Sequence, residues 1–311
     1  MQNPKPIFME NSTTSKILVV GATGFLGMEI CRQLIAANKN VSGLVRKTAG
    51  QEKVNTLMQL GVQMVEGDLK DRASIRKALQ GITTVISTAS STFSRQDGDS
   101  IQTVDNEGQA SLADEAIAAG IQQYIYISFP SMPGEFPLQD AKRRVENKLV
   151  SNNMPYTILQ PTFFAEAWLS PAVGFDFPNA KATIYGEGKN KISWITIQDV
   201  AAFAVASVDN DAAKNKTIEI GGPEALSPLE VVGLFEKAGG KKFELQHVPV
   251  EALQSQKNAA PDDLSKTFAS LMLVYAAGQE INMESTLKAI PVKLNSVNDY
   301  AKRVVLMGQP A

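Results

Sequence analysis

The segment GATGFLG, residues 21–27, follows the apolar run KILVV at residues 16–20 and precedes a stretch with helical periodicity. Three glycines in seven residues need a local reason, because glycine loses more backbone entropy on folding than any other residue. In a strand–turn–helix unit, the first glycine allows a tight turn and the second lets the backbone approach a pyrophosphate. The third allows close packing of the helix on the strand. The turn therefore predicts a dinucleotide site, and the alternative is a turn that merely tolerates glycine.

The helix that begins within this turn strengthens the prediction. Its N-terminus supplies unpaired N–H groups and a partial positive charge, both of which favour phosphate. The glycine spacing is Gly-x-x-Gly-x-x-Gly, which differs from the Gly-x-Gly-x-x-Gly of common dehydrogenases. We expect these residues to contact the cofactor: Gly21, Thr23, Gly24, Phe25, Leu26 and Gly27.

Strand-like and helix-like segments alternate along the first half of the chain. The strand-like runs cover residues 17–20, 41–45, 62–65, 85–86, 124–128 and 156–159. Strands that alternate with helices indicate crossover units and a parallel sheet covered on both faces. The fold class is therefore α/β, a Rossmann-like doubly wound parallel sheet with a smaller, partly helical C-terminal substrate lobe.

The pattern becomes irregular and aromatic after Pro161, and it resumes with a helix-like stretch at 200–207 and a strand-like stretch at 217–220. A further helix start is predicted at Ser227, with Pro228 at the first helical position and Glu230 completing a capping box. We therefore expect an NAD(P)-binding domain over 16–160, to which 192–222 returns. Residues 161–191 and 223–311 form the smaller substrate-binding lobe.

Composition narrows the classes of partner. The chain has 311 residues, 44% apolar content and a formal net charge of −2, with no long run of one sign. Nucleic acid and membrane partners are therefore not expected. Cys31 is the only cysteine, which fits a reducing compartment and excludes an internal disulfide. We expect a cytoplasmic protein without a bound metal. The oligomeric state does not follow from the sequence.

Several segments together resemble one branch of a known family. GATGFLG is similar to the turn of extended and atypical short-chain dehydrogenase/reductases. The segments LVRK (44–47), EGDLKD (66–71), AKRRVENKL (141–149), YTILQPTFF (156–164) and SWITIQDVA (193–201) resemble the NmrA-like and isoflavone-reductase-like branch. The resemblance runs from about residue 16 to 223 and more loosely to the C-terminus. It implies a nicotinamide dinucleotide cofactor.

The residues after the second strand-like run indicate which dinucleotide is bound. NAD-dependent enzymes place an acidic residue about 20 residues past the glycines, where it binds the ribose 2′-hydroxyl. Arg46 and Lys47 stand there instead. A guanidinium can grip a 2′-phosphate with paired charge-assisted bonds, so we predict NADP(H). Asp68 and Leu69 resemble the family's adenine-contacting pair, although Asp68 could equally be a turn residue or helix cap.

The usual catalytic motif of short-chain reductases is incomplete in this sequence. Most short-chain reductases carry Tyr-x-x-x-Lys on one helix face, and the single literal match is Tyr185 with Lys189. Two glycines between them indicate a turn, so this match is rejected. Where the motif belongs, Lys142 is present and Leu138 replaces the tyrosine, as the resemblance to the isoflavone-reductase-like branch implies. We interpret Lys142 as a ligand of the nicotinamide ribose, against the alternative of a solvated basic helix face. Ser128 is the other polar candidate.

Aromatic residues near the expected ends of the fifth and sixth strands predict an apolar substrate pocket. The candidates are Phe129, Phe163, Phe164 and Trp168, although they could simply belong to the core. The only histidine, His247, has no acidic or nucleophilic neighbour in the sequence.

Two functions follow from these patterns. The first is an NADPH-dependent oxidoreductase that reduces a small apolar, aromatic or quinone-like acceptor. The second is a non-catalytic NADP(H)-binding sensor that acts through a protein partner. The retained Lys142 and the aromatic residues favour the enzyme.

Overall fold

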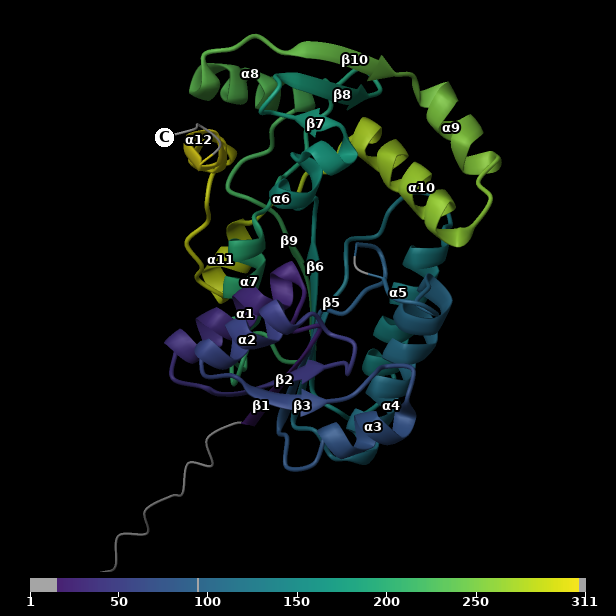
Figure 1. Ribbon diagram of the computed structural model, residues 1–311, viewed down its shortest axis with the longest axis vertical. Helices are drawn as coiled ribbons and strands as arrows, with labels where there is room; N and C mark the ends of the chain where they lie inside the picture. The colour runs from purple at the N-terminus through teal and green to yellow at the C-terminus, as the bar shows by residue number, and fades with distance from the viewer. Residues whose placement is uncertain (1–15, 94, 308–311) are drawn as a thin grey trace, which may run out of the picture.

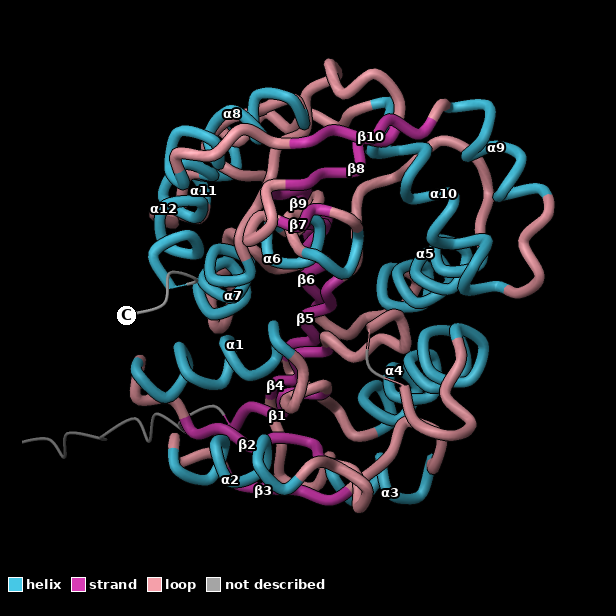
Figure 2. The backbone as a smooth tube through the Cα atoms, turned by 45° about the horizontal axis from the view of Figure 1, so that its top comes forward, coloured by secondary structure: helices cyan, strands magenta, loops and turns pink. Residues whose placement is uncertain are grey.

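Seven parallel strands form the central sheet of the computed structural model, which describes residues 16–93 and 95–307 (Figures 1 and 2). Their order across the sheet is β3-β2-β1-β4-β5-β6-β9. The strands are β1 (Lys16–Val20), β2 (Asn40–Val45), β3 (Gln63–Glu66), β4 (Thr84–Ser87), β5 (Gln123–Ile127), β6 (Tyr156–Pro161) and β9 (Lys216–Ile220). Each predicted strand is present to within a few residues, and the predicted Rossmann-like class is confirmed.

Buried apolar strands explain why the sheet is covered on both faces. In β1, Ile17 and Val19 pack into one core cluster, whereas Leu18 and Val20 pack into another on the opposite face. Strands of this kind are apolar in nearly every position, because alternate side chains enter two separate layers.

Two helical layers enclose the sheet (Figure 1). One layer contains α1 (Phe25–Ala36), α2 (Gln51–Gln59) and α7 (Ile197–Ala206), and the other contains α3 (Arg72–Ala78), α4 (Gln109–Ala118) and α5 (Pro137–Val150). A π-helical segment, η1 (Ile101–Gly108), leads directly into α4. Asp199 lies in the first turn of α7, whose N-cap is Thr196.

The strand order creates a crevice at one place. From β1 the chain winds to β2 and β3 on one side, and it then crosses to β4, β5 and β6 on the other. Ligands of open α/β sheets bind outside the carboxyl ends of the strands where the order reverses. The end of β1, flanked by the ends of β2 and β4, is therefore where a dinucleotide is expected.

A second unit lies beyond the carboxyl edge of the central sheet (Figure 1). Its three-stranded sheet has the order β10-β8-β7. The strands are β7 (Phe175–Asp176), β8 (Lys181–Tyr185) and β10 (Glu244–Val248), and the helices are α6 (Ala165–Trp168), η2 (Pro171–Val173), α8 (Pro228–Gly239), α9 (Val250–Asn258), α10 (Asp263–Ala277) and α12 (Val297–Met307). Ser227 and Glu230 form the predicted capping box, and Gly240 ends α8 with φ +66°.

One segment of the expected lobe lies with the central sheet instead. Helix α11 (Glu284–Ala289) and its flanking residues pack into the same core cluster as α1 and α7. Helix α11 also contacts β9, the edge strand of the central sheet. The range 223–311, expected for the lobe, therefore contains a stretch near 281–294 that covers the sheet. None of the helices within residues 16–93 and 95–307 is long and apolar enough to cross a membrane.

Candidate cofactor and substrate site

The fold itself requires two of the three glycines in the turn after β1. Gly21 has φ +89°, and a β-carbon there would lie 2.6 Å from Thr88 Oγ1. A β-carbon on Gly27 would lie 2.1 Å from the carbonyl oxygen of Gly21, so only glycine lets α1 approach the turn this closely. Gly24 N–H donates to Gly21 O at 2.9 Å and closes the turn. These contacts account for the first and third glycines without any ligand.

Gly24 is different, because the protein fold does not exclude a side chain there. It is the N-cap of α1 with φ −79°, and its β-carbon would meet only Gly21 O, at 3.2 Å. The missing side chain leaves space in front of the first helical turn, where backbone N–H groups lack intrahelical acceptors. That combination fits a diphosphate group. Gly24 is therefore the glycine at which the fold does not exclude a β-carbon, whereas a bound dinucleotide would.

The other turn residues surround this space in different ways. Thr23 and Leu26 are half-buried, and Leu26 packs against the core cluster on the α1 side of the sheet. Phe25 is 78% exposed, and Lys53 Nζ lies 5.7 Å from the centre of its ring. The phenyl ring of Phe25 therefore presents its apolar surface to water and does not belong to the core. Backbone N–H groups of these residues remain candidates for the pyrophosphate.

The basic residue after β2 is held by an acidic residue from a distant loop. Arg46 Nη1 lies 2.6 Å from Asp99 Oδ2, and Lys70 Nζ pairs with the other carboxylate oxygen of Asp99. The Asp99 side chain is 2% exposed. Burial alone would raise the pKa of Asp99, but the hydrogen bonds from Lys70, Arg46 and Gln96 N–H hold it below its ordinary value. Sequence reasoning found Arg46 but neither Lys70 nor Asp99.

Three further residues predicted to bind the adenosine end of the cofactor follow β2 and β3: Lys47, Asp68 and Leu69. Lys47 is 80% exposed, with its Nζ 3.4 Å from Glu66 Oε1. Asp68 Oδ1 accepts a hydrogen bond of 2.9 Å from Lys70 N–H, which makes Asp68 a turn residue as the alternative interpretation held. Leu69 is buried and packs in the core cluster on the α4 side. An adenine-contacting role for Asp68 and Leu69 stays a prediction.

Lys142 lies at the other end of the crevice. Its side chain on α5 is buried, and Nζ donates to Ile127 O, the last residue of β5, at 3.0 Å. The ammonium also lies 4.9 Å from the centre of the Tyr126 ring. Burial lowers the pKa of Lys142, and the negative charges of Asp105 and Glu146 oppose that shift. Lys142 is therefore buried, and the alternative of a solvated basic helix face does not describe it.

Ser128 follows directly after β5 and is buried. Its hydroxyl is 3.5 Å from Arg143 Nη2, at the limit of a hydrogen bond. Arg143 also donates to Phe129 O and, at 2.8 Å through Nη1, to Glu146 Oε2. The guanidinium therefore fixes the chain just past β5, where Ser128 stands and next to Ile127, whose carbonyl accepts from Lys142.

Two buried acidic residues were missed by sequence reasoning. Glu146 accepts from Gln160 Nε2 at 2.9 Å, which connects α5 to β6. Asp105 on η1 accepts from Ser91 N–H and Oγ at 3.0 and 2.7 Å, while its Oδ1 has no hydrogen-bond partner within the described chain. π-Helical turns often occur at functional sites. Only the three-dimensional structure identifies these carboxylates, because Ser91 and Gln160 each lie 14 residues along the chain from the carboxylate that they contact.

The four aromatic candidates do not form one cluster. Phe163 is 3% exposed and packs edge-on against Trp168, with ring centroids 4.8 Å apart, so it is part of the lobe core. Phe129 is half-buried and stacks on Phe136 at 6.0 Å. Phe164 packs in the cluster on the α7 side of the sheet. Trp168 and Phe129 remain the better candidates for substrate contact, since both are half-buried and pack against the lobe core, whereas Phe164 packs on the α7 side of the sheet.

The rejected motif and the histidine have structural roles. Tyr185 donates its hydroxyl to Val173 O at 2.9 Å, and Lys189 pairs with Glu187 on the surface. Gly186 and Gly188 both have positive φ, which confirms that this stretch is a turn. His247 Nδ1 lies 2.9 Å from Gly186 O. In the described part of the chain, no three His, Cys, Asp or Glu side chains are arranged to hold a metal ion.

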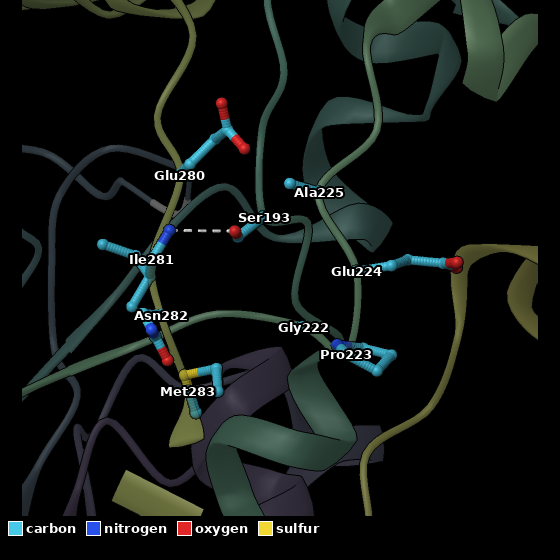
Figure 3. A pocket seen from close by; sticks show the side chains of 9 residues that line it. All are labelled: Ser193, Gly222, Pro223, Glu224, Ala225, Glu280, Ile281, Asn282 and Met283. Atoms are coloured by element: carbon cyan, nitrogen blue, oxygen red, sulfur yellow. Dashed lines mark hydrogen bonds between the residues drawn. The ribbon is translucent and has the colours of Figure 1, made fainter. Parts of the chain in front are cut away.

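A hollow of about 350 Å³ lies past the end of β9 (Figure 3). It is lined by Ser193, Gly222, Pro223, Glu224, Ala225, Glu280, Ile281, Asn282 and Met283. Ile281 N–H donates to Ser193 Oγ at 3.0 Å across its upper side, and Glu224 points away from it. No predicted site residue lines this hollow, so it is separate from the crevice at the end of β1.

Known proteins resemble the chain along most of its length. The NmrA-like family profile matches residues 13–301. The isoflavone reductase homolog IRL of Zea mays is 29% identical over 324 residues, which cover 94% of this chain and 99% of that protein. The photosystem II assembly factor Ycf39 of Synechocystis sp. is 31% identical over 245 residues, covering 78% of this chain and 73% of that protein.

A solved structure shows the same fold. The NADPH complex of the quinone oxidoreductase QOR2 from Escherichia coli superposes with a TM-score of 0.74 at 22% identity, covering 93% of this chain and 99% of that one. The family match spans both the sheet and the lobe, and it confirms the resemblance that the sequence motifs indicated from about residue 16 to 223 and more loosely to the C-terminus. The chain therefore belongs to the NmrA-like family.

Proposed function

We propose that this protein is an NADPH-dependent oxidoreductase that transfers a hydride to a small apolar, aromatic or quinone-like acceptor. The observation that carries the proposal is Gly24 at the N-terminus of α1, where a β-carbon would meet only Gly21 O, at 3.2 Å, and where a diphosphate would need the missing side chain. The cationic pair Arg46 and Lys70 lies at one end of the same crevice, and buried Lys142 lies at the other. The names of the relatives, an isoflavone reductase homolog and an NADPH-dependent quinone oxidoreductase, support this function.

The protein's own groups would act by binding and orientation. When bound, NADPH supplies the hydride. The first turn of α1 binds the diphosphate, and Arg46 binds the 2′-phosphate. Lys142 keeps one N–H on Ile127 O, which holds the ammonium in place and leaves its other two donors for the ribose hydroxyls. Ser128 and Lys142 are our candidates for donating the proton that accompanies the hydride.

The acceptor would bind on the lobe side of β5 and β6. The half-buried rings of Phe129 and Trp168 offer apolar surface there, and Arg143 lies 5.6 Å from the centre of the Phe129 ring. An apolar site with a few fixed polar groups suits a flat aromatic acceptor. The division into a cofactor domain and a substrate lobe, and a cytoplasmic location, remain parts of the proposal.

The direct test is NADPH oxidation by the purified protein, measured against a panel of quinones and aromatic carbonyls. We expect turnover with at least one quinone and saturation in both substrates. Lys142→Met should reduce that turnover while leaving the protein folded. NADPH binding by calorimetry without turnover on any acceptor would contradict the enzymatic function.

A second function is favoured by one observation, the similarity to Ycf39, which is named as an assembly factor rather than a reductase. In that case the chain binds NADP(H) and acts through a protein partner. The discriminating result is a tight NADPH complex that turns over no acceptor and whose association with a partner protein differs between NADPH and NADP⁺.

A further inference from the structure

Three separate parts of the chain meet at the Asp99 carboxylate. Arg46 comes from the end of β2 and Lys70 from the loop after β3, and their cationic groups contact different oxygens of Asp99. Both cationic side chains are partly exposed, at 27% and 28%, whereas the Asp99 side chain is 2% exposed. The anion is therefore enclosed by protein and the two cations face outward.

Asp99 is fixed in this position by its own backbone neighbours. Gln96 N–H donates to Asp99 Oδ2 at 2.9 Å, and the Gln96 side chain donates to Thr48 O at 2.9 Å. The next residue, Ser100, is the N-cap of η1 and forms a capping box with Thr103. These contacts do not involve Arg46 or Lys70. The carboxylate therefore stays beside the two cations even when another anion approaches them.

Lys47, the neighbour of Arg46 in the sequence, does not join this group. Its side chain is 80% exposed and its nearest anion is Glu66 at 3.4 Å. An exposed pair of this kind contributes little, because water and salt screen it. Lys70, by contrast, shares an anion with Arg46 and lies 3.9 Å from one oxygen of Asp68. In the structure, therefore, the second cation beside Arg46 is Lys70, and not Lys47 as the sequence had suggested.

We propose that Lys70 and Arg46 together bind the 2′-phosphate of NADPH, and that Asp99 competes with this phosphate for both cations and so limits the preference for NADPH over NADH. This inference rests on the proposed NADPH dependence. Arg46 uses only Nη1 for Asp99, so its other N–H groups can face a phosphate. With Asp99 ionised, the three groups carry a net charge of +1, against about −1.5 to −2 on a phosphate monoester.

The neighbouring charges agree with this assignment. Within residues 16–93 and 95–307, Asp68 is the one further acidic group that an ion pair places beside Lys70, and Gln96 contributes only a neutral amide. Removing the Asp99 charge would leave two cations facing the phosphate and one carboxylate near Lys70. Because NADH carries no 2′-phosphate, its affinity should not respond to that change.

The test is titration calorimetry of wild type, Asp99→Asn and Lys70→Met with NADPH and with NADH at fixed ionic strength. Asparagine keeps an oxygen to accept from Gln96 N–H, so Asp99→Asn preserves the loop contact. We expect Asp99→Asn to bind NADPH roughly tenfold more tightly, which corresponds to about 1.4 kcal/mol, with NADH unchanged. Lys70→Met should weaken NADPH binding roughly tenfold and leave NADH unchanged.

Two further variants sharpen the comparison. Lys47→Met should weaken NADPH binding only about twofold, since an exposed charge is screened. Lys77→Met removes an exposed lysine of α3 outside the cluster and serves as the control for overall charge. Adenosine 2′,5′-bisphosphate, which carries the phosphate without the nicotinamide, should show the same order of affinities as NADPH.

Several results would overturn the inference. A larger loss in Lys47→Met than in Lys70→Met would make Lys47 the second cation. Weaker NADPH binding in Asp99→Asn would mean that Asp99 positions the cations rather than competing for them. If Asp99→Asn does not fold, the comparison of Lys70→Met with Lys47→Met still decides the second cation. Wild-type protein that binds neither cofactor would instead refute the proposed function itself, and the inference with it.

Discussion

Gly24→Val tests whether the turn after β1 binds a diphosphate. Valine would put its β-carbon 3.2 Å from Gly21 O, which a shift of a few tenths of an ångström relieves. Its two methyl groups would enter the space in front of the first turn of α1. We therefore expect a folded protein that has lost its cofactor site.

The magnitude follows from the hydrogen bonds that the methyl groups would prevent. A hydrogen bond to a charged group contributes about 1.5–3 kcal/mol, so losing two of them weakens binding by roughly 3–6 kcal/mol. Since each 1.4 kcal/mol is about tenfold, NADPH affinity should fall by roughly a hundredfold to ten-thousandfold. The cost to folding should be about 1 kcal/mol, because valine is a poor N-cap residue.

Gly50→Val is a matched control, since Gly50 is the N-cap of α2 and a β-carbon there meets nothing within 4 Å. It should lose similar stability in thermal unfolding and retain NADPH binding in calorimetry. Gly27→Ala should fail to fold normally, because its β-carbon would lie 2.1 Å from Gly21 O. Wild-type NADPH affinity in folded Gly24→Val would refute the assignment of this turn.

Three further changes have defined outcomes. Arg46→Ala should weaken NADPH binding by roughly ten- to a hundredfold and leave NADH nearly unchanged in calorimetry; equal losses would assign Arg46 to the fold or the adenine. Lys142→Met should lower turnover and weaken cofactor binding, whereas Tyr185→Phe should leave turnover unchanged in a steady-state assay, and the reverse pattern would restore the rejected motif. Hydrogen bonds from Arg76 and Arg72 lower the pKa of Glu115 to about 2. The Glu115 charge therefore stabilises the folded state at pH values above the ordinary carboxylate pKa, and this contribution is lost as the pH falls toward 2. Glu115→Gln should therefore be less stable than wild type at neutral pH in urea unfolding, with the difference vanishing near pH 2; a constant difference would contradict this.

Sequence patterns predicted the fold well because its signals are local. Each buried strand is a short apolar run, and the glycines at 21 and 27 are imposed by a turn seven residues long. The capping box at Ser227 involves residues only three apart. The alternation of strands with helices predicted a parallel sheet, and the preferred hand of the crossovers limits the strand orders that such a sheet can adopt.

The electrostatics of the site were not predictable in the same way. Arg46 and Asp99 are 53 residues apart, and Lys70 is 29 residues from Asp99, so nothing in the sequence indicates that one carboxylate serves both cations. Adjacency suggested Lys47, whose side chain turns toward Glu66 instead. The burial of the aromatic candidates was not predictable either, because an aromatic residue that follows a strand can belong to the core or line a pocket. Phe163 lies in the core.

The residue that replaces the usual tyrosine limits which acceptors this site can reduce. Leu138 lies four residues before Lys142 and is buried in the core of the lobe, so that position supplies neither a hydroxyl nor an open path to the crevice. Hydride transfer to a simple ketone yields an alkoxide, about as basic as hydroxide, whose conjugate acid water has a pKa of about 15.7. Such a product needs a strong proton donor at the reacting oxygen. Transfer to a quinone yields a phenolate-like anion with a pKa of about 10, as for tyrosine, which water can protonate without such a donor. Under the proposed function, the absence of a hydroxyl at Leu138 would therefore favour quinones over simple ketones as acceptors, and Lys142 would act without a tyrosine partner.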